Sequence, residues 1–339
     1  MSELPRATLR ATACPSWQQE LARAVRDPGE LVRLLELPPT LLEPARAAAR
    51  HFPLRVPRGY VARMERGNPN DPLLRQVLPL ATELDTVPGF VADPVGDLSA
   101  SRGAGILHKY YGRVLLITTG ACAVNCRYCF RRHFPYTEAN ASVEQWQPAL
   151  RYIAGHPEIE EVILSGGDPL TLTDRRLAQL TAQLADIPHI RRLRVHSRLP
   201  VVLPARITDE MLGWFAGNRL QPVMVLHANH ANELDETVAN AIKYLRAAGV
   251  TILNQTVLLR GVNDEATTLT ALNRRLFDSG ALPYYLHLLD RVAGASHFEI
   301  TPRRARELHR QIAARLPGYL VPRLVQEIEG APGKSWLPP

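Results

Sequence analysis

Apolar residues in the last two thirds of the chain fall into short runs that alternate with longer amphipathic segments. Six runs have the length and composition of buried strands: residues 114–118, 161–165, 192–196, 222–226, 251–257 and 284–288. Segments with apolar positions at helical spacing accompany them at residues 143–154, 173–185, 208–216, 234–248, 265–279 and 301–316. This alternation predicts a parallel α/β domain. Six units are too few for a closed eight-unit barrel, so we expect a partial, open (β/α)6 barrel of the TIM type.

The first hundred residues show a different pattern. Residues 17–25, 30–37 and 40–50 predict three short helices, with Ser16 as the N-cap of the first and Asp27-Pro28 as its end. Residues 51–98 are rich in Pro, Arg and Asp and have little periodicity. We therefore interpret residues 1–100 as a helical extension with a connecting arm, residues 101–318 as the barrel and residues 319–339 as a C-terminal segment.

Composition is that of a globular protein, with 46% hydrophobic residues among 339. No stretch approaches the roughly 18 apolar residues that a transmembrane helix needs, so we expect a soluble, cytoplasmic protein. The net charge of +7 is spread in short groups of arginines. Such a charge favours acidic partners, either nucleic acid or an acidic protein surface. A solvated surface rich in arginine explains the charge equally well.

Three of the four cysteines form a C-x3-C-x2-C run directly after the first predicted strand of the barrel: Cys122, Cys126 and Cys129. Cubane iron–sulfur clusters are normally held by four thiolates, so three thiolates leave one iron open to a small molecule. The run therefore predicts a [4Fe–4S] cluster that takes part in chemistry. A structural zinc site is the alternative, with Cys14 or His133 as its fourth ligand. A disulfide framework does not suit a long chain with few cysteines.

A second unusual loop, containing Gly166, Gly167 and Asp168, follows the next predicted strand. Two consecutive glycines allow the backbone to approach a ligand closely. A tight turn between a strand and a helix is the alternative explanation. Because the carboxyl ends of parallel strands meet at one face of a barrel, we expect this loop to lie beside the cysteines.

With these two loops, the sequence resembles the radical S-adenosylmethionine (SAM) enzymes. In that family the open iron binds the amino and carboxylate groups of SAM, and one electron cleaves it to a 5′-deoxyadenosyl radical. Five further segments resemble lysine 2,3-aminomutase: residues 107–116, 197–204, 227–230, 254–264 and 283–290. The resemblance covers about residues 100–335 and depends on several loops that agree in order and spacing.

This resemblance implies SAM and pyridoxal phosphate (PLP) as cofactors and assigns residues to each. For the amino end of SAM it implies Gly166, Gly167 and Asp168, and for its carboxylate, ribose or adenine Ser197, His227 and Gln255. For PLP it implies a Schiff base with Lys334, which follows Gly330-Ala331-Pro332-Gly333, and a phosphate site at Arg113 and Lys109.

The resemblance also implies how the substrate, L-lysine, is held. Arg131 matches the arginine that binds the substrate carboxylate, and a guanidinium suits that task. Asp290 and Glu327 match the two acids that bind the side-chain ammonium. Glu327 is longer than the aspartate of the family, and Glu329 competes for the same role.

The chain ends five residues after Lys334, and the glycine run before that lysine is broken. Both features resemble the branch of the family that supplies β-lysine for the modification of elongation factor P. That branch works with a lysyl-tRNA-synthetase-like ligase and needs a one-electron reductant; an oligomer is compatible with the sequence. Two alternatives stay open: an aminomutase for another amino acid, such as glutamate, and a zinc-stabilised, basic nucleic-acid-binding protein.

Overall fold

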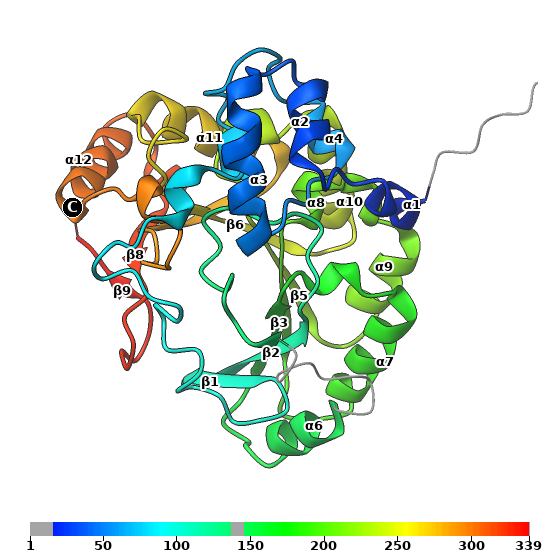
Figure 1. The fold of residues 1–339 in the computed structure, drawn as a ribbon. Helices are drawn as coiled ribbons and strands as arrows, with labels where there is room; N and C mark the ends of the chain where they lie inside the picture. The colour runs from blue at the N-terminus through cyan, green and yellow to red at the C-terminus, as the bar shows by residue number, and fades with distance from the viewer. Residues whose placement is uncertain (1–15, 137–145, 339) are drawn as a thin grey trace, which may run out of the picture.

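In the computed structural model, which describes residues 16–136 and 146–338, one continuous sheet of nine strands forms the centre of the protein (Figure 1). The strands follow one another across the sheet in chain order: β1 (Ile106–Tyr110), β2 (Arg113–Thr119), β3 (Glu161–Gly166), β4 (Arg192–Ser197), β5 (Gln221–Leu226), β6 (Thr251–Val257), β7 (Leu282–His287), β8 (Arg323–Gln326) and β9 (Ser335–Trp336). Strands β2 to β8 are parallel, whereas β1 and β9 pair antiparallel at the two edges. Within the described residues the two edge strands do not pair with each other, so the barrel is open.

The predicted α/β class and the open barrel are confirmed. The six predicted strands correspond to β2 to β7. The structure adds β8 as a seventh parallel strand and a short antiparallel strand at each edge. These three strands have only two to five residues each. A segment this short carries too few alternating positions to be recognised by its period.

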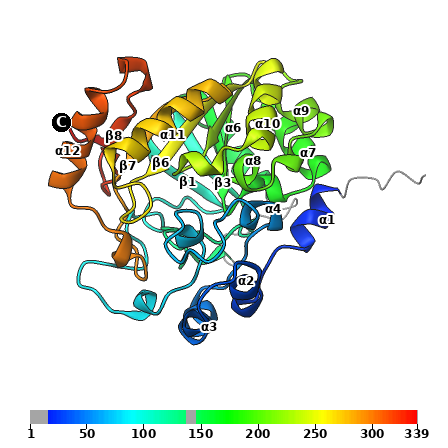
Figure 2. The same cartoon turned by 90° about the horizontal axis from the view of Figure 1, so that it is seen from above.

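Most of the helices lie along the outer side of the curved sheet (Figure 2). The helices of the barrel are α6 (Trp146–Ala154), α7 (Asp174–Ala185), α8 (Leu199–Val202), α9 (Asp209–Phe215), α10 (Glu236–Ala247), α11 (Ala266–Ser279) and α12 (Pro302–Ala313). Six of them were predicted, and α8 was not. Their apolar faces pack on the sheet, as the buried Leu177, Leu180 and Leu184 of α7 illustrate. The first residues of the predicted helix 143–154 lie outside the described residues.

The N-terminal region is built into the same hydrophobic core as the barrel. Its helices are α1 (Trp17–Ala22), α2 (Pro28–Leu34), α3 (Leu42–His51) and α4 (Arg58–Val61). Ser16 caps α1 as predicted, since its side chain accepts a hydrogen bond from the backbone N–H of Gln19. Beyond these helices, the buried side chains of Leu54, Leu73 and Leu74 belong to one cluster with residues of β2 and β3. Because these positions follow no helical or strand period, the sequence did not predict that residues 51–98 contribute to the core.

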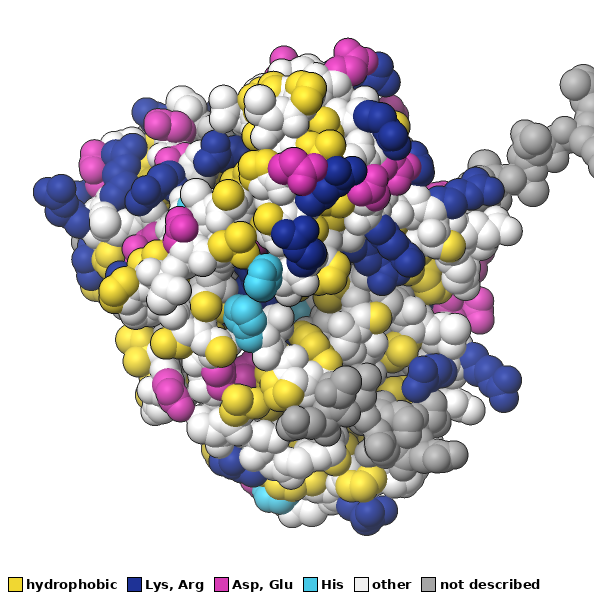
Figure 3. Space-filling model, viewed as in Figure 1, with side chains coloured by type: hydrophobic (Ala, Val, Ile, Leu, Met, Phe, Trp, Pro, Cys, Tyr) yellow, Lys and Arg dark blue, Asp and Glu magenta, His cyan; other side chains and the backbone are white. Residues whose placement is uncertain are grey.

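Charged side chains of both signs cover the face of the molecule seen in Figure 3. Dark blue Lys and Arg side chains lie among magenta Asp and Glu side chains on that face, and they do not form one continuous basic area. None of the helices among the described residues combines the length and the apolar character that crossing a bilayer requires.

Candidate active site

A cavity of about 780 Å³ lies at the carboxyl ends of the parallel strands. This volume falls within the range of sites for small molecules and cofactors. All fifteen residues that the sequence predicted for the site line it: Lys109, Arg113, Cys122, Cys126, Cys129, Arg131, Gly166, Gly167, Asp168, Ser197, His227, Gln255, Asp290, Glu327 and Lys334. The structure therefore brings the predicted residues together, whereas their individual roles stay predictions.

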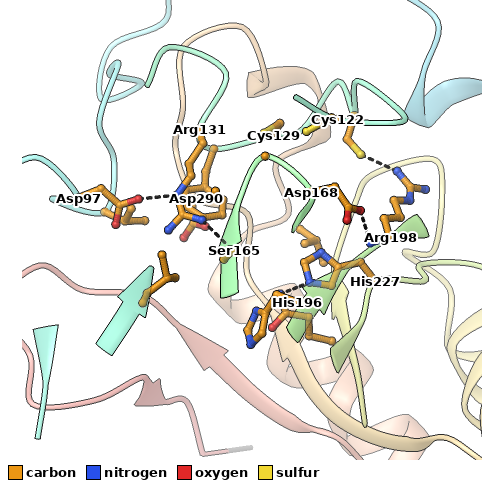
Figure 4. Close-up of a pocket in the computed structure, with 18 of the residues that line it drawn as sticks. Asp97, Cys122, Cys129, Arg131, Ser165, Asp168, His196, Arg198, His227 and Asp290 are labelled. Atoms are coloured by element: carbon orange, nitrogen blue, oxygen red, sulfur yellow. Dashed lines mark hydrogen bonds and ion pairs between the residues drawn. The ribbon is translucent and has the colours of Figure 1, made fainter. Parts of the chain in front are cut away.

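Two groups of side chains lie on different sides of this cavity (Figure 4). One group, here called the cysteine side, consists of the three cysteines, Asp168 and Arg198. The other, here called the lysine side, consists of Asp97, Arg131 and Asp290, together with Glu327 and Lys334, which are connected to Asp97 through Lys109. Asp97 and Arg198 were not among the predicted site residues.

The three cysteines follow β2, and all three are free thiols. Burial raises the pKa of Cys122, and it raises the pKa of Cys129 to about 11. A metal centre must therefore displace their protons when it binds. In the described part of the chain, no three His, Cys, Asp or Glu side chains lie close enough together to bind one metal ion. A cubane makes a different demand, since each thiolate binds a different iron.

One of the two proposed fourth ligands of a zinc site, His133, does not lie with the thiols. His133 is absent from the residues that line the cavity, and its Nε2 lies 3.1 Å from the carbonyl oxygen of Ala293. Cys14 lies outside the described residues. Three free thiols on one loop fit a [4Fe–4S] cluster with one open iron.

Two arginines of the cysteine loop attach it to the N-terminal region, where Glu83 is their common partner. Arg127 is fully buried, and its Nε donates to Glu83 over 2.8 Å, while a terminal nitrogen donates to the carbonyl oxygen of Phe52 over 2.8 Å. Arg132 donates to the same Glu83 carboxylate over 2.8 Å. No sequence pattern pointed to Glu83, because an ion pair between residues 44 positions apart leaves no local pattern.

The two glycines after β3 are required by their close approach to the cysteine loop. A Cβ atom on Gly167 would lie 2.4 Å from the carbonyl oxygen of Ala121, and Gly166 has a φ of +114°. Backbone N–H groups of Gly167 and Asp168 donate to Thr119 and Ala121 across the same contact. The tight packing of two loops therefore explains these glycines without a ligand, although it does not exclude one.

The carboxylate of Asp168 is fully occupied within the protein. It accepts hydrogen bonds from the Ser197 hydroxyl over 2.8 Å and from the backbone N–H groups of Leu170, Arg198 and Leu199. Burial nevertheless raises the pKa of this carboxyl group, and the hydrogen bonds oppose that shift. The predicted contact of this loop with the amino end of SAM therefore concerns the backbone rather than the Asp168 carboxylate, and it remains a prediction.

His227 and Gln255 form a hydrogen-bonded pair at the floor of the cavity. The two side-chain nitrogens lie 2.9 Å apart, and Gln255 can only donate through its nitrogen. The Nε2 of His227 is therefore the acceptor, and its proton is on Nδ1. Burial, together with the charges of Arg198, Arg131 and Lys334, lowers the pKa of His227 to about 3, so the ring is neutral.

On the lysine side, Lys334 and Glu327 form an ion pair. The Nζ of Lys334 lies 2.8 Å from one carboxylate oxygen of Glu327, and Tyr110 donates to the other oxygen. Burial favours the protonated form, but Lys334 and the hydrogen bonds hold the pKa of Glu327 below its usual value. Glu329 instead accepts from the Ser99 hydroxyl over 2.7 Å and does not line this cavity. Of the two competing acids, only Glu327 is placed at the site.

Asp97 joins two of the predicted cations. One of its oxygens lies 2.6 Å from the Nζ of Lys109, and the other accepts from the Nε of Arg131 over 2.7 Å. A terminal nitrogen of Arg131 also donates to the Ser165 hydroxyl over 3.2 Å. This arrangement fixes the orientation of the Arg131 guanidinium and neutralises part of the positive charge. Asp97 was missed because it lies in the segment without periodicity.

Asp290 differs from the other acids of the cavity. Among the described residues, its carboxylate has no hydrogen-bond or ion-pair partner, although it lines the cavity. Burial raises its pKa to about 7, with Lys334 opposing the shift and Glu327 and Asp97 adding to it. An unpaired carboxylate in such a place is suited to bind a cationic group that the protein itself does not supply.

Comparison with known proteins places the chain in a family. The family described as "Radical SAM superfamily" matches residues 116–271. The L-lysine 2,3-aminomutase of Escherichia coli (strain K12) is 52% identical over 331 residues, which cover 97% of this chain and 96% of that protein. The chain belongs to the L-lysine 2,3-aminomutase family. Since the matched residues number 331, the similarity extends well beyond residues 100–335 into the N-terminal region.

More distant relatives are also similar. The L-lysine 2,3-aminomutase of Clostridium subterminale is 33% identical over 325 residues, which cover 95% of this chain and 78% of that protein. Among solved structures, a radical SAM methyltransferase from Sphaerobacter thermophilus is 18% identical, with a TM-score of 0.47 and coverage of 66% of this chain and 69% of that one.

Radical SAM enzymes use a [4Fe–4S] cluster and SAM, and lysine 2,3-aminomutases, which are isomerases, also use PLP. The lysine side fits PLP. Lys334, the predicted amine for a covalent link, lines the cavity, and no described residue forms a hydrogen bond or ion pair with the guanidinium of Arg113, which lies 4.7 Å from the centre of the Tyr110 ring. An unpaired guanidinium is available to a phosphate. Lys109 is already paired with Asp97, so its contribution to the phosphate site is a weaker prediction.

Proposed function

We propose that this protein is an L-lysine 2,3-aminomutase that converts L-lysine into β-lysine by moving the amino group from C2 to C3. The main observation behind this proposal is that all fifteen predicted residues line one cavity. Membership of the family and 52% identity to an enzyme of that name support it.

The protein's own residues bind and orient the substrate in this proposal. When bound, the cluster and SAM supply a deoxyadenosyl radical, and PLP supplies the conjugated system across which the amino group moves. Asp97 and Ser165 hold part of the Arg131 guanidinium, and its remaining N–H groups bind the substrate carboxylate. Asp290 binds the side-chain ammonium. Both contacts fix the Cβ–H bond of lysine in place.

Glu327 has a conditional role, because Lys334 occupies its carboxylate. It becomes available to the substrate ammonium only after the ammonium of Lys334 has left. The extra methylene of Glu327, compared with the aspartate of the family, helps it to reach both Lys334 and Tyr110 from β8. Glutamate in place of the family's aspartate at position 327 is thus compatible with a role in binding lysine.

We further propose that the β-lysine serves the modification of elongation factor P, with a lysyl-tRNA-synthetase-like ligase as the pathway partner and an external one-electron reductant. This role places the enzyme in the cytoplasm. The broken glycine run before Lys334 supports this branch, as does the higher identity to the E. coli relative than to the clostridial one. Mass spectrometry of elongation factor P from cells that lack the gene tests it, since the β-lysyl group should be absent and should return with the gene.

An anaerobic assay tests the central activity. The protein is reconstituted with iron and sulfide and incubated with L-lysine, PLP, SAM and dithionite, and β-lysine is measured by chromatography. We expect β-lysine from the wild-type protein and none from Cys126→Ala. Well-reconstituted protein that forms no β-lysine would refute the proposal.

The same assay separates the alternatives. A glutamate aminomutase would need a cationic or amide partner for the substrate side chain, whereas the unpaired group at this place is Asp290. We expect turnover of lysine and not of glutamate, and we expect Asp290→Lys to abolish it. About four irons and four sulfides per chain are expected, whereas a colourless protein that contains zinc would favour the nucleic-acid-binding alternative.

A further inference from the structure

Arg198 connects the cysteine loop to the interior of the protein. It follows β4 at the start of α8, and it is 5% exposed. One terminal nitrogen of its guanidinium donates to the Sγ atom of Cys126 over 2.7 Å. The functional assignment gives no role to this contact between a permanent cation and a cluster ligand.

The rest of the guanidinium is held so that this N–H group keeps its direction. Its other terminal nitrogen lies 2.9 Å from Glu233, 2.6 Å from the side-chain oxygen of Gln76 and 3.0 Å from the hydroxyl of Tyr60. The rings of Tyr60 and Tyr128 lie beside the guanidinium. Four residues from three separate parts of the chain thus determine one orientation.

The partner carboxylate is fixed as well. Glu233 is fully buried, and its second oxygen accepts from the backbone N–H groups of Asn229 and His230 over 2.8 and 3.0 Å. A buried pair of Arg206 and Asp174, 2.7 Å apart, provides a comparison within the same protein. That pair contacts no cysteine, so the N–H group aimed at sulfur is specific to Arg198.

Hydrogen bonds to the sulfurs of an iron–sulfur cluster and nearby charges set its reduction potential. A donor and a positive charge stabilise the reduced form, because that form carries one more negative charge. We propose that Arg198 is a positioning residue that raises the reduction potential of the cluster by donating a hydrogen bond to Cys126. This inference rests on the proposed function, since it requires the three cysteines to hold a [4Fe–4S] cluster.

The test is a redox titration followed by electron paramagnetic resonance on the full-length, reconstituted protein without SAM or lysine. Dithionite supplies the single electron that converts the oxidised cluster into the reduced one. The variant Arg198→Met/Glu233→Gln removes the donor and also removes the charge of its buried partner, Glu233. We expect the ratio of reduced to oxidised cluster at a given potential to fall about tenfold, which corresponds to a midpoint about 59 mV lower for one electron.

Two further variants separate this role from a merely structural one. Glu233→Gln alone keeps the donor and removes a negative charge, so we expect the midpoint to rise. Arg206→Met/Asp174→Asn removes a buried pair that makes no hydrogen bond to a thiol, so we expect lower thermal stability and an unchanged midpoint. If Arg198 had only a structural role, the midpoint would not fall in Arg198→Met/Glu233→Gln and rise in Glu233→Gln.

The outcomes distinguish this inference from the proposed function. A wild-type midpoint in both Glu233→Gln and the double variant, at full iron content, would overturn the inference and leave the function standing. If the double variant loses its iron, the test depends on Glu233→Gln. An unchanged midpoint in Glu233→Gln would then overturn the inference. A wild-type protein that assembles no [4Fe–4S] cluster would overturn the proposed function itself.

Discussion

The cysteine loop and Lys334, on the two sides of the cavity, are held in place in different ways. Arg127, Glu83 and Arg198 fix the cysteine loop from inside the protein, and the side chains of the first two are at most 1% exposed. Lys334 lies between the four-residue strand β8 and the two-residue strand β9, and its side chain is 25% exposed. Few other contacts hold it besides its ion pair with Glu327.

This difference agrees with the two proposed tasks. A cluster with an open iron needs three thiols in a constant arrangement through every turnover. A lysine that forms and breaks a covalent link to PLP must exchange its partners, so it cannot be enclosed by many permanent bonds. Substitutions around the cysteine loop should therefore lower stability, whereas substitutions around Lys334 should lower turnover and leave stability almost unchanged.

The largest expected effect is that of Lys334→Ala. We expect no detectable β-lysine and no absorbance from covalently bound PLP, while the free energy of unfolding changes by about 1 kcal/mol or less, since the lost ion pair is partly exposed. Activity, absorbance and thermal unfolding are measured on the same preparation. Glu329→Gln, on the same tail but outside the cavity, is the control and should retain activity. If Lys334→Ala unfolds much more easily than the wild-type protein, Lys334 is not held as loosely as the comparison with the cysteine loop requires.

Arg127→Met tests the cysteine side. Removing one partner of a buried ion pair costs about 3–5 kcal/mol, and we expect about 3 kcal/mol because Arg132 still pairs with Glu83. Iron content should fall together with stability, as measured by chemical denaturation and iron analysis. Full stability with normal iron content would show that the N-terminal region does not hold the loop.

Asp290→Asn changes the lysine side without disturbing a bond within the protein. If Asp290 binds the substrate ammonium, the loss of a hydrogen bond to a charged group costs about 1.5–3 kcal/mol. We expect the KM for lysine to rise roughly 10- to 100-fold, with a normal iron content and a normal melting temperature. Steady-state kinetics check this, and an unchanged KM would remove Asp290 from the substrate site.

Two glycine substitutions compare the packing of the two sides directly. Gly167→Ala would place a Cβ atom 2.4 Å from the carbonyl oxygen of Ala121, so we expect a loss of about 1–3 kcal/mol and less bound iron. A Cβ atom on Gly333 would meet nothing within 4 Å, so Gly333→Ala should change stability by about 0.5 kcal/mol or less. Equal effects in denaturant titrations would argue against a looser lysine side.

A pH dependence of substrate binding would sharpen the comparison without any substitution. Burial raises the pKa of Asp290 to about 7, so the carboxylate gains a proton as the pH falls through 7 and loses its attraction for an ammonium group. We expect the KM for lysine to rise about tenfold per pH unit below 7 and to be flat above it. In Asp290→Asn this dependence should disappear, and its persistence would assign it to another group.

Local patterns in the sequence predicted much of the site. The C-x3-C-x2-C spacing and the Gly-Gly-Asp loop placed six of the fifteen residues that line the cavity, and the resemblance to lysine 2,3-aminomutase implied the other nine. Asp97, Glu83 and Arg198 were missed. Each makes its contribution through a partner at least 34 positions away, and a pairing of this kind leaves no period or motif to read.

The sequence by itself determined the alternation of strands and helices and the loop of three thiols, because each depends on neighbours along the chain, whereas Lys334 was a candidate only through the resemblance to the family. Only the tertiary structure decided which charges are neutralised and which are left for a ligand. Asp168 and Glu327 are engaged within the protein, whereas Asp290 is not. The reason is physical: the pairing of a buried charge depends on which distant segments meet around it when the core forms.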